Sequence, residues 1–289
     1  MPLDHAAMID HIVRLERWRD SRVLVMAASS LDMELLPALL RQCRALGAAP
    51  RLDVVLHGRG GVVHAARRIA LLLREQTDHL AFLVPYRCES AATLLTLCAD
   101  EVVAGELAIF SPIDPQLHGI DGSAFSALDI QAFGDMAQQW FGIDAAAARE
   151  QSLALLCQGV APPSLGAFYR STLEMTQIAE QLLAFQLPQH DAAFRQQLVR
   201  HLTSGYHSHH YAITPGELAA LGLRMTRDPE AEQLSWEISL QIQEHIGGAV
   251  RDSAEDPWLD ALLATRDGVE TRYARADGLA PRWRREPGA

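Results

Sequence analysis

The chain has 289 residues, of which 49% are hydrophobic and 21% charged, so it can form a buried core in one large α/β domain or two small ones and is not a disordered protein. The net charge of −11 argues against a protein whose whole surface binds nucleic-acid phosphates. All 25 basic residues are arginine, and the absence of lysine excludes a Walker-type phosphate loop, Schiff-base chemistry and Ser–Lys hydrolysis.

Strands and helices alternate through the first 110 residues. Apolar residues recur at helical spacing in some segments and form short continuous runs in others. Such alternation predicts a mostly parallel sheet with helices on its faces. We expect helices at residues 8–19, 35–44, 62–73 and 90–99, and strands at residues 23–26, 52–56, 80–84, 102–104 and 107–110.

After residue 118 the pattern becomes helical. Pro162 and Pro163 open a long helix that stops before Pro188. Thr214 and Glu217 have the spacing of a capping box around a short helix. We expect helices at residues 162–187, 191–203, 214–222 and 228–246.

The cysteines and the N-terminus indicate the compartment. The N-terminus has no apolar signal region, and no apolar run is long enough to span a bilayer. We therefore predict a soluble cytoplasmic protein. Its cysteines have no paired spacing, which is typical of reduced thiols: Cys43, Cys88, Cys98 and Cys157.

A glycine-rich segment, HGRGG at residues 57–61, lies between an expected strand and the helix that follows. Consecutive glycines let backbone N–H groups point into a concavity, as an oxyanion or a phosphate requires. Position 63 is valine, so the segment is not a dinucleotide fingerprint. A tight turn without a ligand is the alternative interpretation.

Ser90 begins an apolar helix. A helix N-terminus offers free N–H donors and the positive end of the dipole, both of which stabilise a developing anion. The alternative is an ordinary N-cap serine. Cys88, two residues earlier, is interpreted as a buried packing residue rather than a nucleophile.

Two later segments offer an acid and imidazoles. Asp114 lies between Pro112 and Pro115, which restrict the backbone and can fix the direction of the carboxylate, although an Asx turn is the alternative. The segment HSHH at residues 207–210 follows an expected helix and can exchange protons near neutral pH. A solvated loop and a metal site with ligands from elsewhere are the alternatives there.

The order of these segments resembles a known family. Residues 52–117, from LDVVLHGRGG through CESAATLLTLCADEVV to SPIDPQL, resemble the SDH (serine dehydrogenase) proteinases, relatives of signal peptide peptidase A and of the Clp peptidases. The later stretch TSGYHSHHYAIT, followed by ELAALGL, resembles the histidine-bearing loop of that family. The resemblance covers roughly residues 8–225 and implies an α/β, Clp/crotonase-like fold of repeated β-β-α units with additional C-terminal helices.

Carried over residue by residue, the resemblance implies a catalytic triad. Ser90 corresponds to the nucleophile, Asp114 to the acid and His209 to the base. His207 and His210 are the alternative bases. The implied oxyanion hole uses backbone N–H groups of three residues: Gly60, Gly61 and Ala91.

The resemblance implies an ATP-independent serine peptidase that needs no cofactor or metal. It would act on peptide or protein substrates and form a homo-oligomer. From the charge and the apolar runs we expect no nucleic-acid partner and no membrane span. A crotonase-like acyl-CoA enzyme and a catalytically inactive Clp-fold assembly module are the alternative functions. The implied domains are a catalytic domain at residues 1–225, a helical extension at residues 226–280 and a disordered tail at residues 281–289.

Overall fold

The structure is a computed structural model that describes residues 3–118, 124–247, 251–277 and 282–287. It divides into two compact units, and each is described by itself. Unit 1 comprises Met1–Ser111, Gln181–Asp191 and Ala212–Ala289. Unit 2 comprises Pro112–Glu180 and Ala192–Tyr211.

Unit 1 is built on one large sheet. The strands pair in the order β12-β11-β10-β1-β2-β3-β5-β9, with β4 attached to β2 and β6. The pairs from β1 through β9 are parallel, whereas β10, β11 and β12 join antiparallel. The strands are β1 (Arg22–Ala28), β2 (Ala49–Gly58), β3 (Thr77–Val84), β4 (Arg87–Cys88), β5 (Glu101–Ala104), β6 (Ile109–Phe110), β9 (Met225–Thr226), β10 (Trp258–Thr265), β11 (Gly268–Ala274) and β12 (Trp283–Pro287).

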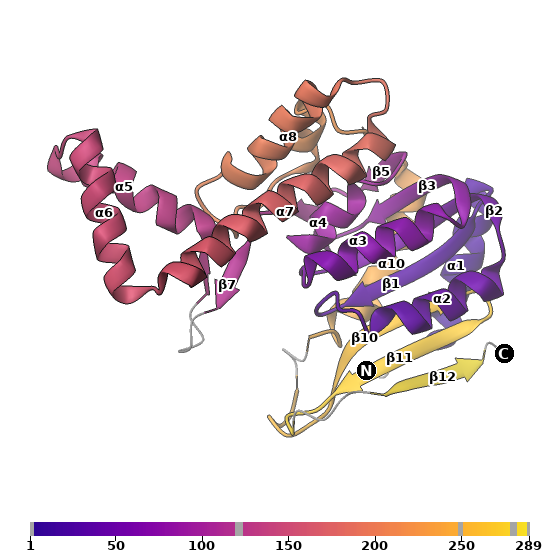
Figure 1. The fold of residues 1–289 in the computed structure, drawn as a ribbon. Helices are drawn as coiled ribbons and strands as arrows, with labels where there is room; N and C mark the ends of the chain where they lie inside the picture. The colour runs from indigo at the N-terminus through magenta and orange to yellow at the C-terminus, as the bar shows by residue number, and fades with distance from the viewer. Residues whose placement is uncertain (1–2, 119–123, 248–250, 278–281, 288–289) are drawn as a thin grey trace. The chain divides into compact units, whose positions relative to one another are not determined.

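Helices cover both faces of this sheet (Figure 1). They are α1 (His5–Arg19), α2 (Leu35–Leu46), α3 (Val63–Arg74), α4 (Ala91–Thr96), α9 (Pro215–Ala220) and α10 (Pro229–Gln243). Because side chains alternate across a strand, Val23 and Val25 of β1 pack in one core cluster with α1 and α10. Leu24 and Met26 are also fully buried and face the side covered by α2 and α3. Burial on both faces explains why β1 is apolar after Arg22.

The C-terminal segment differs from the sequence prediction. The α/β class and the expected elements before residue 111 are confirmed, but the helical extension at residues 226–280 is wrong beyond α10, because β10 and β11 extend the sheet next to β1. β10 is a nearly continuous apolar run because neighbours cover it, and such a run has no period-two signal. The expected tail at residues 281–289 contains β12, which pairs with β11.

Unit 2 consists of a short hairpin and helices. Its strands are β7 (Gln116–His118) and β8 (Ala124–Ser126), which pair antiparallel. Its helices are α5 (Ala127–Phe141), α6 (Ala145–Gly159), α7 (Pro162–Gln186), whose last residues belong to unit 1, and α8 (Ala192–Ser204). The expected change to helices after residue 118 is therefore confirmed from α5 to α8, and β8 to β12 depart from it. Among the described residues, no helix is both long and apolar enough to cross a membrane.

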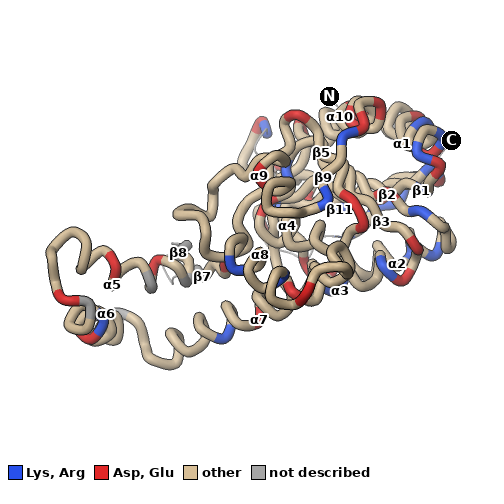
Figure 2. The backbone as a smooth tube through the Cα atoms, turned by 90° about the horizontal axis from the view of Figure 1, so that it is seen from above, with Lys and Arg blue, Asp and Glu red and all other residues tan. Residues whose placement is uncertain are grey.

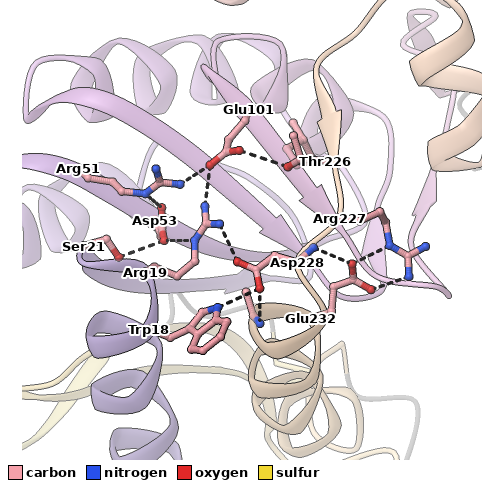
Figure 3. Close-up of polar contacts among 12 residues, drawn as sticks. Trp18, Arg19, Ser21, Arg51, Asp53, Glu101, Thr226, Arg227, Asp228 and Glu232 are labelled. Atoms are coloured by element: carbon pink, nitrogen blue, oxygen red, sulfur yellow. Dashed lines mark hydrogen bonds and ion pairs between the residues drawn. The ribbon is translucent and has the colours of Figure 1, made fainter.

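An ion-pair network joins the amino ends of the parallel strands of unit 1 (Figure 3). Arg19 donates to Asp53 at 2.8 Å, to Glu101 at 2.7 Å and to Asp228 at 2.9 Å. Arg51 also donates to Asp53 and Glu101. Since Asp53 is fully buried, the network supplies the opposite charge that this carboxylate needs. It ties α1 and α10 to β2 and β5.

Candidate active site

The glycine-rich loop follows β2 and needs its glycines. Gly60 has φ +106° and Gly61 has φ +133°, a region that residues with a Cβ rarely adopt. A Cβ on Gly60 would lie 2.7 Å from the Cβ of Ser90, and one on Gly61 would lie 2.3 Å from the backbone nitrogen of Leu31. The Leu31 N–H donates to the Gly60 carbonyl at 2.7 Å. The loop is thus held between Leu31 on one side and Ser90 on the other.

The C-terminal hairpin fixes residues 29–32, and Leu31 of this segment is hydrogen-bonded to the glycine loop. Arg272 of β11 is 2% exposed and donates twice to Asp32, at 3.1 and 2.7 Å. It also donates to Asp260 at 2.7 Å. The Ser29 hydroxyl donates to the backbone carbonyl of Asp260 at 3.1 Å. The residues around Leu31 are therefore attached to strands that the sequence analysis did not predict.

Ser90 has a strained backbone. Its φ of +53° and ψ of −119° lie outside the regions that serine normally occupies. It holds the N-cap position of α4, but its side chain makes no capping hydrogen bond. The ordinary N-cap interpretation is therefore wrong. Such strain persists where the surrounding structure enforces it, which is common at functional sites.

A chain of buried hydroxyls enforces this conformation. The Ser90 N–H donates to the hydroxyl of Ser111 at 2.7 Å. The backbone N–H of Ser111 donates to the Thr93 hydroxyl at 3.1 Å, and that hydroxyl donates to the carbonyl of Cys88 at 2.7 Å. Ser111 and Thr93 were not singled out from the sequence, because isolated small polar residues in apolar segments carry no distinctive pattern.

Free backbone N–H groups lie around Ser90. Ala91 is the first residue of α4, so its N–H has no acceptor within the helix. Among the backbone hydrogen bonds of the described residues, none is donated by Gly60, Gly61 or Ala91. These are the three residues that the sequence analysis assigned to an oxyanion hole.

In unit 2 an aspartate and a histidine form a close pair. His209 Nδ1 lies 2.8 Å from Asp114 Oδ1, and Asp114 is 2% exposed. The second oxygen, Oδ2, accepts from Gln116 at 2.6 Å and from the Ser126 hydroxyl at 2.5 Å. Burial by itself raises the pKa of Asp114, but the hydrogen bonds from His209, Ser126 and Gln116 outweigh burial and lower the pKa below its ordinary value. Asp114 is therefore an ionised carboxylate with fixed partners.

The pair sets the state of the imidazole. An ionised carboxylate accepts the proton on Nδ1, which leaves Nε2 of His209 as the basic nitrogen. His207 and His210 are exposed, and the His210 ring lies edge-on to His209 with centroids 5.6 Å apart. The histidine of this loop that is hydrogen-bonded to Asp114 is His209.

Two other groups close to Ser90 in the chain or on the neighbouring strand do not fit a catalytic role. Cys88 is fully buried, and burial raises the pKa of its thiol well above the ordinary value, so the thiol stays protonated. His57 is 2% exposed, and its pKa is lowered to about 4 by burial, with a further contribution from the charges of Arg59 and Arg87. It is a neutral core residue. Within the described part of the chain, no three His, Cys, Asp or Glu residues are arranged to hold a metal ion.

The candidate residues fall into two groups. Ser90, Gly60, Gly61 and Ala91 belong to unit 1, where they lie together. Asp114 and His209 belong to unit 2, where they are hydrogen-bonded. The structure brings together the members of each group.

The family model that matches this chain covers Ser90, the glycine loop and Asp114. Residues 5–132 match the ClpP-like SDH-type serine proteinases. The match confirms the family resemblance and the ClpP-like fold expected from residues 52–117, and the matched class is that of serine peptidases. Ser90 and Asp114 lie inside the matched segment, and His209 lies outside it.

Two curated relatives come from the archaeon Methanocaldococcus jannaschii. The uncharacterized protein MJ0137 is 39% identical over 77 residues, which are 26% of this chain and 27% of the relative. The uncharacterized protein MJ1495 is 23% identical over 227 residues, which are 74% of this chain and 70% of the relative. The chain thus spans little more than a quarter of the first relative.

Two solved structures of the 1510-N membrane-bound stomatin-specific protease also match. Each is 14% identical, with TM-scores of 0.41 and 0.42. The matches cover 69% and 70% of this chain and 76% and 73% of the solved chains. Scores this low say nothing about the activity of this chain.

Proposed function

We propose that this protein is a serine peptidase with a Ser90–His209–Asp114 triad. The observation that carries the proposal is the 2.8 Å hydrogen bond between His209 and buried Asp114, which orients an imidazole as a general base. The strained Ser90, with a hydroxyl not used for capping, supplies the matching nucleophile.

The proposed reaction forms and breaks an acyl-enzyme. Ser90 Oγ attacks the substrate carbonyl carbon while His209 Nε2 takes the hydroxyl proton, and Asp114 stabilises the imidazolium. The negative charge on the carbonyl oxygen is stabilised by N–H groups of the glycine loop and of Ala91; loss of one such donor typically costs about 3 kcal/mol. His209 then protonates the leaving amine. Water then attacks the acyl-enzyme while His209 takes its proton. His209 returns a proton to Ser90 Oγ as the acyl group leaves.

Substrate and assembly are further parts of the proposal. The substrates are peptides or proteins, and hydrolysis uses neither ATP nor a cofactor. We propose a homo-oligomer on the basis of large exposed apolar side chains in unit 2: Trp140, Phe141, Leu153, Leu155, Tyr169 and Leu173. Figure 2 shows long uncharged stretches along α5, α6 and α7. We also place the protein in the cytoplasm.

Light scattering tests the assembly. We expect a mass of at least twice 31.8 kDa for the wild type. The double variant Trp140→Ser, Phe141→Ser removes two adjacent residues whose side chains are the most exposed of this set. It is expected to shift the population toward the monomer. A wild-type monomer at all concentrations would refute this part of the proposal.

Active-site labelling tests the activity. A fluorophosphonate is expected to label the wild type at Ser90 and not to label Ser90→Ala. The control is Ser164→Ala, which removes an exposed hydroxyl from α7. Absence of labelling in the wild type, or equal labelling of Ser90→Ala, would refute the proposal.

A further inference from the structure

A pocket lies in unit 1 at the amino ends of β1 and β2. Its volume is about 490 Å³, within the range of small-molecule sites. It is bordered by the last turn of α1, by Ala49 and Pro50 of β2, and by Arg266, which follows β10. The glycine loop follows the other end of β2, and a strand of this length spans roughly 30 Å. The pocket is therefore separate from the Ser90 group.

The pocket is rich in arginine. Four of its lining residues are arginines, and the acidic lining residues are Glu16 and Asp20, so the lining carries a net charge of +2 within a chain of net charge −11. Arg51 also pairs with Asp53 and Glu101, which lie outside this lining. Figure 2 shows arginine positions around the end of α1 and the starts of β1 and β2. The arginines are Arg17, Arg22, Arg51 and Arg266.

Two of these guanidinium groups share one carboxylate, that of Glu16. Arg266 lies 2.9 Å and Arg22 lies 3.8 Å from the same oxygen of Glu16. Glu16 is 5% exposed, whereas the two arginine side chains are 42% and 43% exposed. One buried carboxylate oxygen thus pairs with two cations without a hydrogen bond to any described residue, and both arginine side chains remain partly exposed.

The other two arginines add to this positive surface. Arg51 is anchored by Asp53 and Glu101 in the network of Figure 3 and remains 26% exposed. Arg17 is exposed in the last turn of α1. Arginines anchored in this way are pre-organised donors, and the fork of a guanidinium matches the oxygens of a phosphate group.

We propose that this pocket binds a small oxyanion of phosphate chemistry with at least two negative charges. Several positive groups from α1, β1, β2 and the turn after β10 would each donate to one ligand. The proposal does not depend on the peptidase activity, because no residue of the pocket belongs to either candidate group around Ser90 or Asp114.

Titration calorimetry with inorganic pyrophosphate tests the proposal. At constant ionic strength, kept with sodium chloride, we expect saturable binding to one site per chain. Arg266→Gln and Arg17→Gln are each expected to raise the Kd about tenfold, the effect of losing one charge-assisted hydrogen bond. Glu16 keeps Arg22 as its partner in Arg266→Gln, and Arg17 is exposed, so both variants should fold.

The matched control is Arg41→Gln, which removes the same charge outside the pocket. Arg41 is 54% exposed and pairs with Glu270 on β11. Its Kd for pyrophosphate should equal that of the wild type. Absence of saturable binding in the wild type, or an equal weakening in all three variants, would overturn the proposal.

Discussion

At the scale of single residues, the proposed catalytic mechanism depends on Asp114. A carboxylate buried to this degree, with both oxygens occupied by hydrogen bonds, has one orientation. It keeps the imidazole of His209 in the tautomer that can accept the proton of a serine hydroxyl. The sequence predicted both residues, but not Gln116 and Ser126, because the partners of a carboxylate become visible only when the chain is folded.

Asp114→Asn should therefore lower kcat by about 10⁴-fold, as the amide favours the other histidine tautomer. Steady-state hydrolysis of a peptide substrate measures this loss. His207→Ala and His210→Ala should retain activity close to wild type. If either variant lost more activity than His209→Ala, the base would be that other histidine and the assignment to His209 would be wrong.

Acid should also inactivate the enzyme, because protonation of Asp114 removes the carboxylate that fixes the tautomer of His209. The pKa of Asp114 is lowered in the folded protein, so its pairing stabilises the fold above the ordinary pKa of an aspartate and is lost as the pH falls through the lowered value. kcat/KM should fall as the pH approaches the lowered pKa of Asp114. An activity that is flat while this pairing is lost would contradict the assigned role of Asp114.

Gly60 gives a second test at this scale. In Gly60→Ala the new Cβ would lie 2.7 Å from that of Ser90, at a φ of +106°. We expect destabilisation by about 1–3 kcal/mol and a loss of labelling at Ser90. Gly166→Ala is the control, since a Cβ there meets no neighbour in α7, and it should leave labelling unchanged. Unfolding in urea and labelling rates measure the two effects.

At the scale of elements, the ion-pair network of Figure 3 holds α1 and α10 to the sheet. Burial raises the pKa of Glu101 and of Asp228, but hydrogen bonds from Arg19 and other donors outweigh it, so both pKa values are lowered in the fold. The network therefore stabilises the protein above the ordinary pKa values of these carboxylates, and this contribution disappears as the pH falls through the lowered values.

Arg19→Met should destabilise the protein at pH 7 by about 3–5 kcal/mol, because it leaves carboxylates without their shared partner. The difference from wild type should shrink at low pH, where the carboxylates take up protons. Arg14→Met, which removes a half-exposed pair 3.8 Å from Glu230, should cost about 1 kcal/mol or less. Equal losses for both variants in urea unfolding would contradict the assigned role of the network.

The elements also show where sequence patterns stop being informative. Amphipathic helices such as α2 and α3, and strands closed by glycine or proline, were predicted because their boundaries have local causes. β10 and β11 were not predicted, because β10 is buried between β1 and β11 and has the apolar composition of a buried helix. These strands also hold Asp32 and thereby the glycine loop.

At the scale of the whole molecule, the chain divides the proposed chemistry between two units. The glycine loop and Ser90 come from unit 1, whereas Asp114 and His209 come from unit 2. The sequence predicted the members of both groups through local motifs and a family resemblance. It could not predict the division, because a division into units depends on contacts between segments that are distant in the chain.

The central claim is that Ser90 and His209 act on the same bond. A double-mutant cycle on peptide hydrolysis tests it most directly, since members of one catalytic unit are not additive. We predict that Ser90→Ala and His209→Ala each lower kcat by about 10⁴-fold or more, and that the double variant loses no more than the worse single variant. Losses that multiply in the double variant, or a His209→Ala enzyme with wild-type kcat, would contradict the account.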